Sequence, residues 1–217
     1  MKNYLISKNI SESKVFVTGI PISSRFLKSY NKKEILNEFG LEENKATILF
    51  FAGGEFGLGK NKTVEIFKDL IKNFENIQVI AIAGKNEKMK LHFESIVKEH
   101  NKEDSVKVLE YTNKVPELMA ISNLVVSKPG GLTTSESLAS NLPMIIINPI
   151  PGQEEENAEF LEENGVGIWI RKNDSAYEIF KDLFLNHEKL ETMKKNTENL
   201  AKKHSTEDIC KIILSQT

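Results

Sequence analysis

Residues 46–52 read ATILFFA, a short and continuous apolar run that decides the fold class of this chain. Such a run is typical of a parallel strand that is buried on both faces. Residues 63–74 follow with apolar side chains at helical spacing, and a second apolar run stands at 78–83. The order strand, helix, strand predicts a βαβ unit and therefore a parallel sheet.

The same alternation continues toward the C-terminus. Further strands are predicted at 105–109, 124–127, 143–147 and 167–170, and further helices at 87–99, 116–121, 134–140, 155–163, 176–185, 188–203 and 206–214. We therefore predict an α/β fold, with a Rossmann-like, parallel six-stranded sheet and helices on both faces.

The first 45 residues do not follow this alternation. Residues 4–8 fit the end of a helix, and KVFVT at 14–18 predicts one strand. Residues 23–45 are polar, with a single amphipathic turn around Ile35 and Phe39. We interpret 23–45 as a linker and 46–217 as a domain with C-terminal helices.

The composition argues against several classes of protein. The 217 residues include 29 basic and 31 acidic side chains, which gives a formal charge of −2, whereas nucleic-acid-binding proteins usually carry a strong basic excess. The single cysteine, Cys210, excludes an internal disulfide and a cysteine-cluster zinc site. No apolar run approaches the ~20 residues of a membrane helix, and the residues after Met1 do not read as a signal peptide. We expect a cytoplasmic protein that binds no nucleic acid.

The loop after the first predicted strand is the first candidate for a ligand site, because open parallel sheets bind ligands outside the carboxyl ends of their strands. It reads GGEFGLGK at 53–60, with four glycines directly before a helix. Glycine frees the backbone to wrap an anion, and the helix N-terminus adds partial positive charge and unpaired N–H groups. We favour phosphate contact over a plain flexible turn.

The same loop nearly matches two nucleotide-binding motifs. Gly54, Gly59 and Lys60 have Walker A spacing, but Asn61 stands where a Ser or Thr must hold Mg²⁺. No predicted strand ends in Asp as a second metal anchor, and Lys62 occupies the third glycine position of the dinucleotide fingerprint. An ATPase with a degenerate P-loop is therefore a minor alternative, and we predict no metal site.

A second glycine loop follows the fourth predicted strand and reads SKPGGLTTSE at 127–136. Two such loops at neighbouring strand ends predict a diphosphate held between two helix N-termini. Thr133 and Glu136 also fit the S/T-x-x-E capping box, so the spacing leaves capping and ligand binding equally open. Lys128 fits either a counter-charge for phosphate or a solvated loop lysine.

A third loop, NPIPGQEEEN at 148–157, makes a stiff turn and brings Gln153, Glu154 and Asn157 to the head of a helix. Amide and carboxylate groups there can hold sugar hydroxyls, although acidic residues in a first helical turn are common for dipole reasons alone. On sequence alone the second explanation is the stronger one.

The histidines offer no catalytic arrangement. His92, His100, His187 and His204 all lie in predicted helices, with neither metal-ligand spacing nor a nucleophile–base pattern. We assign them surface or structural roles, and the catalytic residue stays unknown.

Taken together, residues 127–136, NLP at 141–143 and PGQEEEN at 151–157 resemble the donor-binding half of glycosyltransferase family 28. Within it they are most similar to diacylglycerol glucosyltransferases and monogalactosyldiacylglycerol synthases. VTGIPI at 17–22 is similar to the segment where the family's N-terminal domain ends. The likeness covers about residues 9–203, and it implies one half of a GT-B architecture, in which two Rossmann-like domains face each other across a cleft.

The resemblance implies transfer of a hexose from a UDP-sugar, UDP-glucose or UDP-galactose, to a lipid acceptor such as diacylglycerol, with no cofactor. The first glycine loop would wrap the diphosphate, and the start of the helix after the second glycine loop would meet the α-phosphate. The backbone at Thr112 would read the uracil edge, Glu136 would hold the ribose, and Gln153 and Glu154 the sugar. The residues that it implies for the UDP-sugar site are Gly53, Gly54, Glu55, Phe56, Gly57, Gly84, Tyr111, Thr112, Lys128, Gly130, Gly131, Leu132, Thr133, Glu136, Gln153, Glu154 and Asn157.

The family's N-terminal acceptor domain, which carries its candidate base and membrane-binding surface, is absent from this sequence. We expect residues 1–22 to be a remnant of that domain, so the chain would be a gene fragment, an incomplete reading frame or one subunit of a split transferase. Alone, it should bind UDP-sugar and transfer little or none; a catalytically silent nucleotide-binding module is the alternative. The complete protein is expected at the inner face of the membrane as a peripheral protein.

Overall fold

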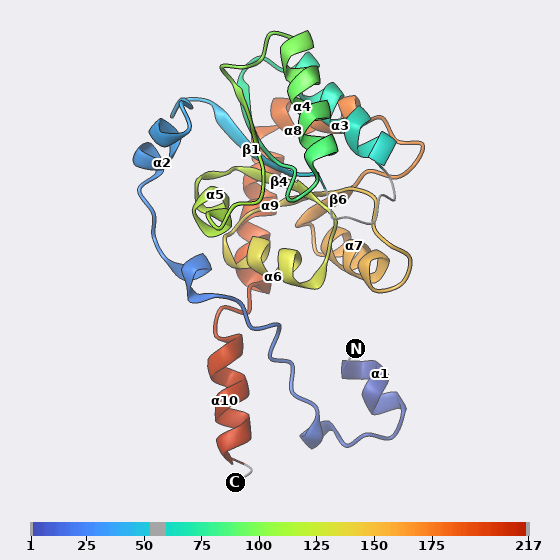
Figure 1. The fold of residues 1–217 in the computed structure, drawn as a ribbon. Coiled ribbons are helices and arrows are strands. Elements are labelled where there is room, and N and C mark those ends of the chain that lie inside the picture. The colour runs from blue at the N-terminus through green and yellow to red at the C-terminus, as the bar shows by residue number, and fades with distance from the viewer. Residues whose placement is uncertain (1, 53–59, 216–217) are drawn as a thin grey trace.

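The computed structural model of the chain describes residues 2–52 and 60–215. Its strands are β1 (Ala46–Phe51), β2 (Ile77–Ile82), β3 (Val106–Leu109), β4 (Leu124–Ser127), β5 (Met144–Ile146) and β6 (Gly167–Trp169). All strand pairs run parallel, in the order β3-β2-β1-β4-β5-β6 (Figure 1). The predicted six-stranded parallel sheet is confirmed.

The helices connect the strands and cover both faces of the sheet (Figure 1). They are α1 (Lys2–Ser7), α2 (Lys32–Glu38), α3 (Lys60–Asn73), α4 (Glu87–Glu99), α5 (Val115–Ile121), α6 (Gly131–Ala139), α7 (Gln153–Glu163), α8 (Ala176–Leu185), α9 (His187–Leu200) and α10 (Ser205–Ser215), with short 3-10 turns η1 (Glu12–Lys14) and η2 (Ser24–Leu27). No helix among the described residues is both long enough and apolar enough to span a lipid bilayer.

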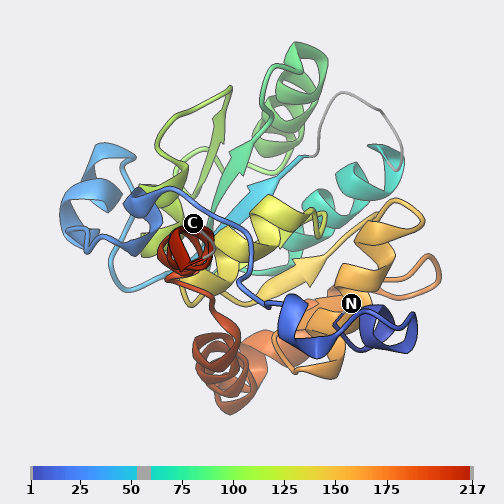
Figure 2. The ribbon, with the colours of Figure 1, turned by 90° about the horizontal axis from the view of Figure 1, so that it is seen from below.

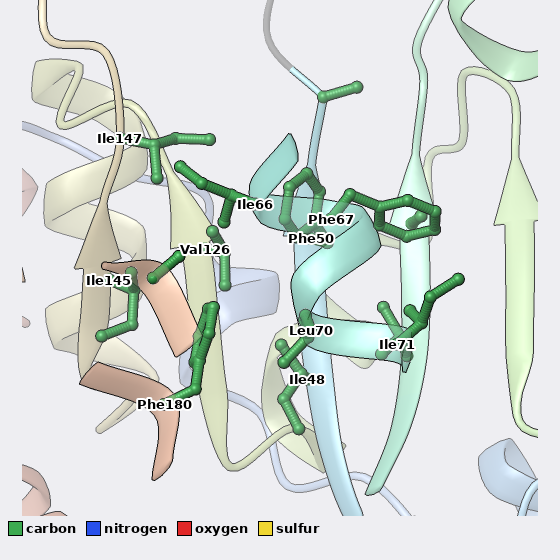
Figure 3. Close-up of a cluster of buried hydrophobic side chains, with 14 of the residues drawn as sticks. Ile48, Phe50, Ile66, Phe67, Leu70, Ile71, Val126, Ile145, Ile147 and Phe180 are labelled. Atoms are coloured by element: carbon green, nitrogen blue, oxygen red, sulfur yellow. The ribbon is translucent and has the colours of Figure 1, made fainter. Parts of the chain in front are cut away.

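Two hydrophobic layers hold the helices to the sheet, because successive residues of a strand face opposite sides. Ile48 and Phe50 of β1 pack with α3, α4 and α8, whereas Leu49 packs with α2, α5, α6 and α7. Figure 3 shows the first layer, in which Phe50 lies beside Phe67 of α3 at 5.3 Å between ring centroids. Both faces of β1 are therefore buried, as the uninterrupted apolar run predicts.

The strand order reverses direction between β1 and β4. From β1 the chain proceeds outward to β2 and β3, then returns through α5 to β4 on the other side of β1. In doubly wound sheets a crevice forms at this point, outside the carboxyl ends of the two strands, and ligands bind there. The topology thus selects the loops after β1 and β4 as the place to look for a site.

The N-terminal segment differs from the prediction. KVFVT at 14–18 forms no strand, and its Phe16 and Val17 side chains are 54% and 61% exposed. A strand requires a hydrogen-bonded neighbour, and within the described residues this segment is not part of the sheet, whose outermost strands are β3 and β6. In Figures 1 and 2 it runs outside the sheet toward α1.

The segment predicted as a linker packs against the domain. Its amphipathic turn is α2, which Asn31 caps through its side chain and in which Leu36 is completely buried. In η2, the guanidinium Nη2 of Arg25 donates to both carboxylate oxygens of Glu117 in α5, at 2.8 and 3.1 Å. Residues 24–38 therefore pack against α5 and join the hydrophobic cluster on that side of the sheet.

Candidate functional site

A cavity of about 290 Å³ opens at the carboxyl ends of β1, β2 and β4, at the switch point of the sheet. Phe51 and Ile82, the last residues of β1 and β2, are register partners and contribute apolar surface to it. Its lining residues are Phe51, Ile82, Gly84, Ser127, Lys128, Gly130, Thr133 and Glu154. Five of these, Gly84, Lys128, Gly130, Thr133 and Glu154, are residues that the sequence predicted for the site.

The N-terminus of α6 faces this cavity without a capping side chain. Gly130 is the N-cap, it offers no side-chain hydrogen bond, and the first turn of α6 contains no acidic residue. The helices α4, α8 and α9 are capped by the side chains of Asn86, Ser175 and Asn186, whereas α5 and α7 also begin without a side-chain cap. The first N–H groups of any helix lack partners within the helix, and together with the helix dipole they attract an anion. The N-terminus of α6 can therefore accept an anion, and Lys128 lines the same cavity.

The capping-box interpretation of Thr133 and Glu136 is wrong. Helix α6 begins at Gly131, three residues before the predicted start, and the N–H of Thr134 donates to the carbonyl oxygen of Gly130 at 2.8 Å. Thr133 is thus the third residue inside the helix and cannot be its cap. Gly130 occupies the N-cap position instead, and glycine is one of the residues favoured there although it has no side chain to donate or accept a capping bond.

The carboxyl of Glu136 is half-buried, and its pKa lies above the ordinary value. It lies three residues after Thr133, hence on the same side of α6. Among the described residues it has no hydrogen-bond or salt-bridge partner, and burial raises the pKa of its carboxyl. A partly buried charge without compensation costs stability, and such groups are concentrated at functional sites.

The first turn of α7 closes the cavity on its other side. The helix begins after Gly152, whose φ of +100° is accessible to glycine and strained for other residues. A carboxylate oxygen of Glu154 accepts from the N–H of Ile150 at 2.7 Å, and Nδ2 of Asn157 donates to the carbonyl oxygen of Pro129 at 2.9 Å. The bond of Glu154 thus stabilises the turn before α7, and the bond of Asn157 connects α7 to the loop before α6.

The starts of α6 and α7 lie next to each other. A Cβ atom built on Gly131 would be 3.8 Å from Nε2 of Gln153, and one built on Gly130 would be 3.9 Å from Oε1 of Glu154. Gln153 is exposed and Glu154 partly buried. The amide and carboxylate expected to hold a sugar are therefore adjacent to the glycines expected to meet a phosphate.

Several predicted residues do not line this cavity, and these include four at or near the starts of α6 and α7: Gly131, Glu136, Gln153 and Asn157. Tyr111 is 71% exposed, Thr112 accepts from the N–H of Lys114 through its hydroxyl at 3.1 Å, and both follow β3. Leu132, in the first turn of α6, is 59% exposed. The predicted residues Gly53, Gly54, Glu55, Phe56 and Gly57 lie outside the described residues.

Three lining residues were missed by the sequence analysis as site residues. Phe51, Ile82 and Ser127 are the last residues of β1, β2 and β4. The signal that could have identified them is their position, because the end of each buried strand in a doubly wound sheet borders the crevice.

A second cavity of about 600 Å³ lies at the ends of β5 and β6, beside the start of α3. None of the predicted site residues lines it. Two of its cations have carboxylate partners: Lys62 pairs with Glu65 at 3.3 Å, and Arg171 pairs with Glu162 at 2.6 Å. A third cation of its lining, Lys172, has no salt-bridge partner among the described residues, so charge does not separate the two cavities. The smaller cavity is the better candidate because it lies at the switch point of the sheet. Among the described residues no three His, Cys, Asp or Glu side chains gather so that they could hold a metal ion.

The sequence matches the family model described as the glycosyltransferase family 28 C-terminal domain over residues 47–211. A curated relative, the processive diacylglycerol beta-glucosyltransferase of Bacillus pumilus (strain SAFR-032), is 35% identical over 217 residues, which is 100% of this chain and 55% of the relative. The chain thus spans about half the length of the curated relatives it matches.

Two solved structures illustrate the shared fold. The putative UDP-N-acetylglucosamine 2-epimerase of Listeria monocytogenes is 17% identical, with a TM-score of 0.76 over 99% of this chain and 57% of its own. Anabaena HepE, solved in complex with UDP-glucose, is 16% identical, with a TM-score of 0.67 over 99% of this chain and 61% of its own. At these identities the likeness concerns the fold alone.

Proposed function

This chain belongs to glycosyltransferase family 28, and we propose that the cavity between the starts of α6 and α7 binds the diphosphate and sugar of a UDP-sugar. The observation that carries the proposal is the N-terminus of α6, which no side chain caps and which opens onto a cavity that Lys128 also lines. An anion with several oxygens satisfies N–H groups and lysine together. A diphosphate is such an anion, and Gln153 and Glu154 stand beside it for hydroxyl groups.

The proposed reaction is transfer of glucose from UDP-glucose to a diacylglycerol-type lipid. The acceptor and the sugar are inferred from the name of the Bacillus pumilus relative. An acceptor hydroxyl oxygen bonds to the anomeric carbon while the bond from that carbon to the diphosphate breaks, and UDP departs with the electron pair. The hydroxyl proton passes to a base that the described residues do not identify.

The role of this chain in that reaction is to hold the donor and to stabilise the leaving group. Negative charge grows on the diphosphate as its bond to the sugar breaks. The N–H groups and dipole of α6, together with Lys128, are already oriented toward that charge, so no reorganisation is needed in the transition state. No step requires a metal ion.

The family and the proposed lipid acceptor lead to further proposals about the domains and the location of the protein. We propose that residues 46–217 form the donor-binding domain and that residues 1–22 belong to the acceptor-binding half. We place the protein in the cytoplasm, peripherally at the membrane where its acceptor resides. The alternative, in which this chain is one subunit of a split transferase, uses the same donor site.

Isothermal titration of the chain with UDP and with ADP, each in the presence of EDTA, tests the proposal. We expect UDP to bind with a dissociation constant between about 1 μM and 1 mM, and more tightly than ADP. No heat at millimolar UDP would refute the proposal. In a repeat with Mg²⁺ in place of EDTA, ADP binding that is tighter than UDP binding would favour the P-loop ATPase instead.

A further inference from the structure

The segment between η1 and η2 passes over the start of α6. A Cβ atom built on Gly131 would lie 3.0 Å from Cδ1 of Ile20, as well as 3.8 Å from Nε2 of Gln153. A residue more than 100 positions away in the sequence thus touches the first residue of α6. Figure 2 shows this N-terminal segment crossing α6.

Gly19 fixes the path of this segment. Its φ is +81°, and a Cβ there would lie 2.5 Å from Cβ of Lys202, closer than such atoms approach in proteins. Lys202 lies between α9 and α10, so the backbone at Gly19 is held against the junction of these helices. Beside it the hydroxyl of Ser205 is buried, with no hydrogen-bond partner among the described residues. The contact at Gly19 determines where the next residue, Ile20, is placed.

The side chain of Ile20 is apolar and 40% exposed, and it borders a helix end with no capping group. Water competes with an anion for the free N–H groups of such an end, and the attraction between charge and dipole grows when water is excluded. An apolar side chain at this position therefore strengthens anion binding without itself making a hydrogen bond.

We propose that Ile20 is a positioning residue of the nucleotide-sugar site, which covers the N-terminus of α6 beside Gln153 and shields the bound diphosphate from water. The inference rests on the proposed function and extends it: residues outside the predicted donor domain help to build the donor site. It is consistent with the glycine at 131, because a side chain there would displace Cδ1 of Ile20 by a few tenths of an ångström.

The first test measures ligand binding. Ile20→Ala should weaken UDP affinity about 3- to 10-fold, since it opens the helix end to water, and leave the affinity for uridine unchanged. The matched control is Val17→Ala, in the same segment and 61% exposed, which should change neither. Equal loss for UDP and uridine would indicate a general structural effect and overturn the inference.

The second test measures the contact itself and needs no ligand. Gly131→Ala adds a methyl group 3.0 Å from Cδ1 of Ile20, whereas Ile20→Val removes that carbon atom. In a double-mutant cycle of melting temperatures, the loss caused by Gly131→Ala should be smaller in the Ile20→Val background. Additive changes in melting temperature would show that the two side chains do not interact and would overturn the inference.

The outcomes separate the two proposals. If the unsubstituted chain binds no UDP, the proposed function fails, and the role of Ile20 fails with it. If the unsubstituted chain binds UDP and Ile20→Ala binds it equally well, only the inference about Ile20 is overturned.

Discussion

The side-chain amide of Asn157 donates a 2.9 Å hydrogen bond to the carbonyl oxygen of Pro129. The first turn of α7 is thereby tied to the loop that leads into α6, and Pro129 is itself buried. Asn157, predicted as a ligand residue, has its amide donor engaged within the protein. We propose that it contributes to the site by holding these two loops together.

Removing this bond should affect stability and binding together. We expect Asn157→Ala to cost about 1 kcal/mol of unfolding free energy, since it leaves a carbonyl oxygen in a buried residue without its donor. UDP affinity should also fall, because the starts of α6 and α7 are no longer tied. Asn164→Ala is the control: its amide bonds to the carbonyl of Phe160 at an exposed site, so urea unfolding should change less and UDP titration not at all. Unchanged UDP binding by Asn157→Ala would contradict the coupling.

Glu136→Gln should stabilise the ligand-free protein while weakening donor binding. Burial raises the pKa of Glu136, so the folded state is penalised while the carboxyl is ionised. The penalty is fully present above the folded pKa and disappears as the pH falls through it toward the unfolded value of about 4.3. The melting temperature of Glu136→Gln should therefore exceed that of the native chain at pH 7, with a difference that shrinks on acidification.

The same substitution removes a charged acceptor for hydroxyl groups. We expect UDP affinity to fall about 10-fold, the usual cost of losing hydrogen bonds to a charged group. A Gln variant that is less stable at pH 7 would show that the carboxylate has a stabilising partner, contrary to its isolation in the structure.

Lys128→Met should weaken UDP binding mainly through charge. Lys128 lines the cavity and has no salt-bridge partner among the described residues. Its loss should lower UDP affinity about 10-fold and make that affinity less sensitive to salt, because one screened attraction is gone. Lys98→Met, at an exposed position on α4, is the matched control for charge. Equal effects of both variants would indicate a non-specific field effect.

Leu36→Ala should show that the segment at 23–45 folds with the domain. Leu36 is completely buried against the sheet, so its truncation should cost about 2–5 kcal/mol of unfolding free energy. Leu91→Ala, 59% exposed on α4, should change the stability by less than about 0.5 kcal/mol. A mild effect at Leu36 would mean that the segment is only loosely attached.

Most of the fold could be predicted because its four central strands are buried on both faces. A run such as that of β1 has no polar alternation, and this restricts it to a covered parallel sheet. KVFVT has the composition of a strand, but pairing depends on a neighbour that composition does not reveal. The start of α6 was predicted too late because Thr133 fits a capping box, whereas Gly130, also an acceptable N-cap residue, is the cap in the structure.

The site was predicted through its loops rather than through individual contacts. The glycine loop after β4 identified Gly130, because strand ends in such a sheet converge, whereas Glu154 was implied by the family resemblance. The contact of Ile20 with Gly131 could not be read from the sequence, since it depends on how a distant segment folds back. The hydrogen bond from Asn157 to Pro129 likewise depends on how two separate loops come together in the fold.

Nuclear magnetic resonance of the backbone amides during titration with UDP-glucose tests directly whether the switch-point cavity binds the donor. Saturable shifts should be largest at residues of the cavity and of the starts of α6 and α7: Gly84, Gly130, Gly131, Thr133 and Glu154. Shifts confined to the other cavity, around Trp169 and Arg171, or no saturable shifts at all, would contradict the proposed site.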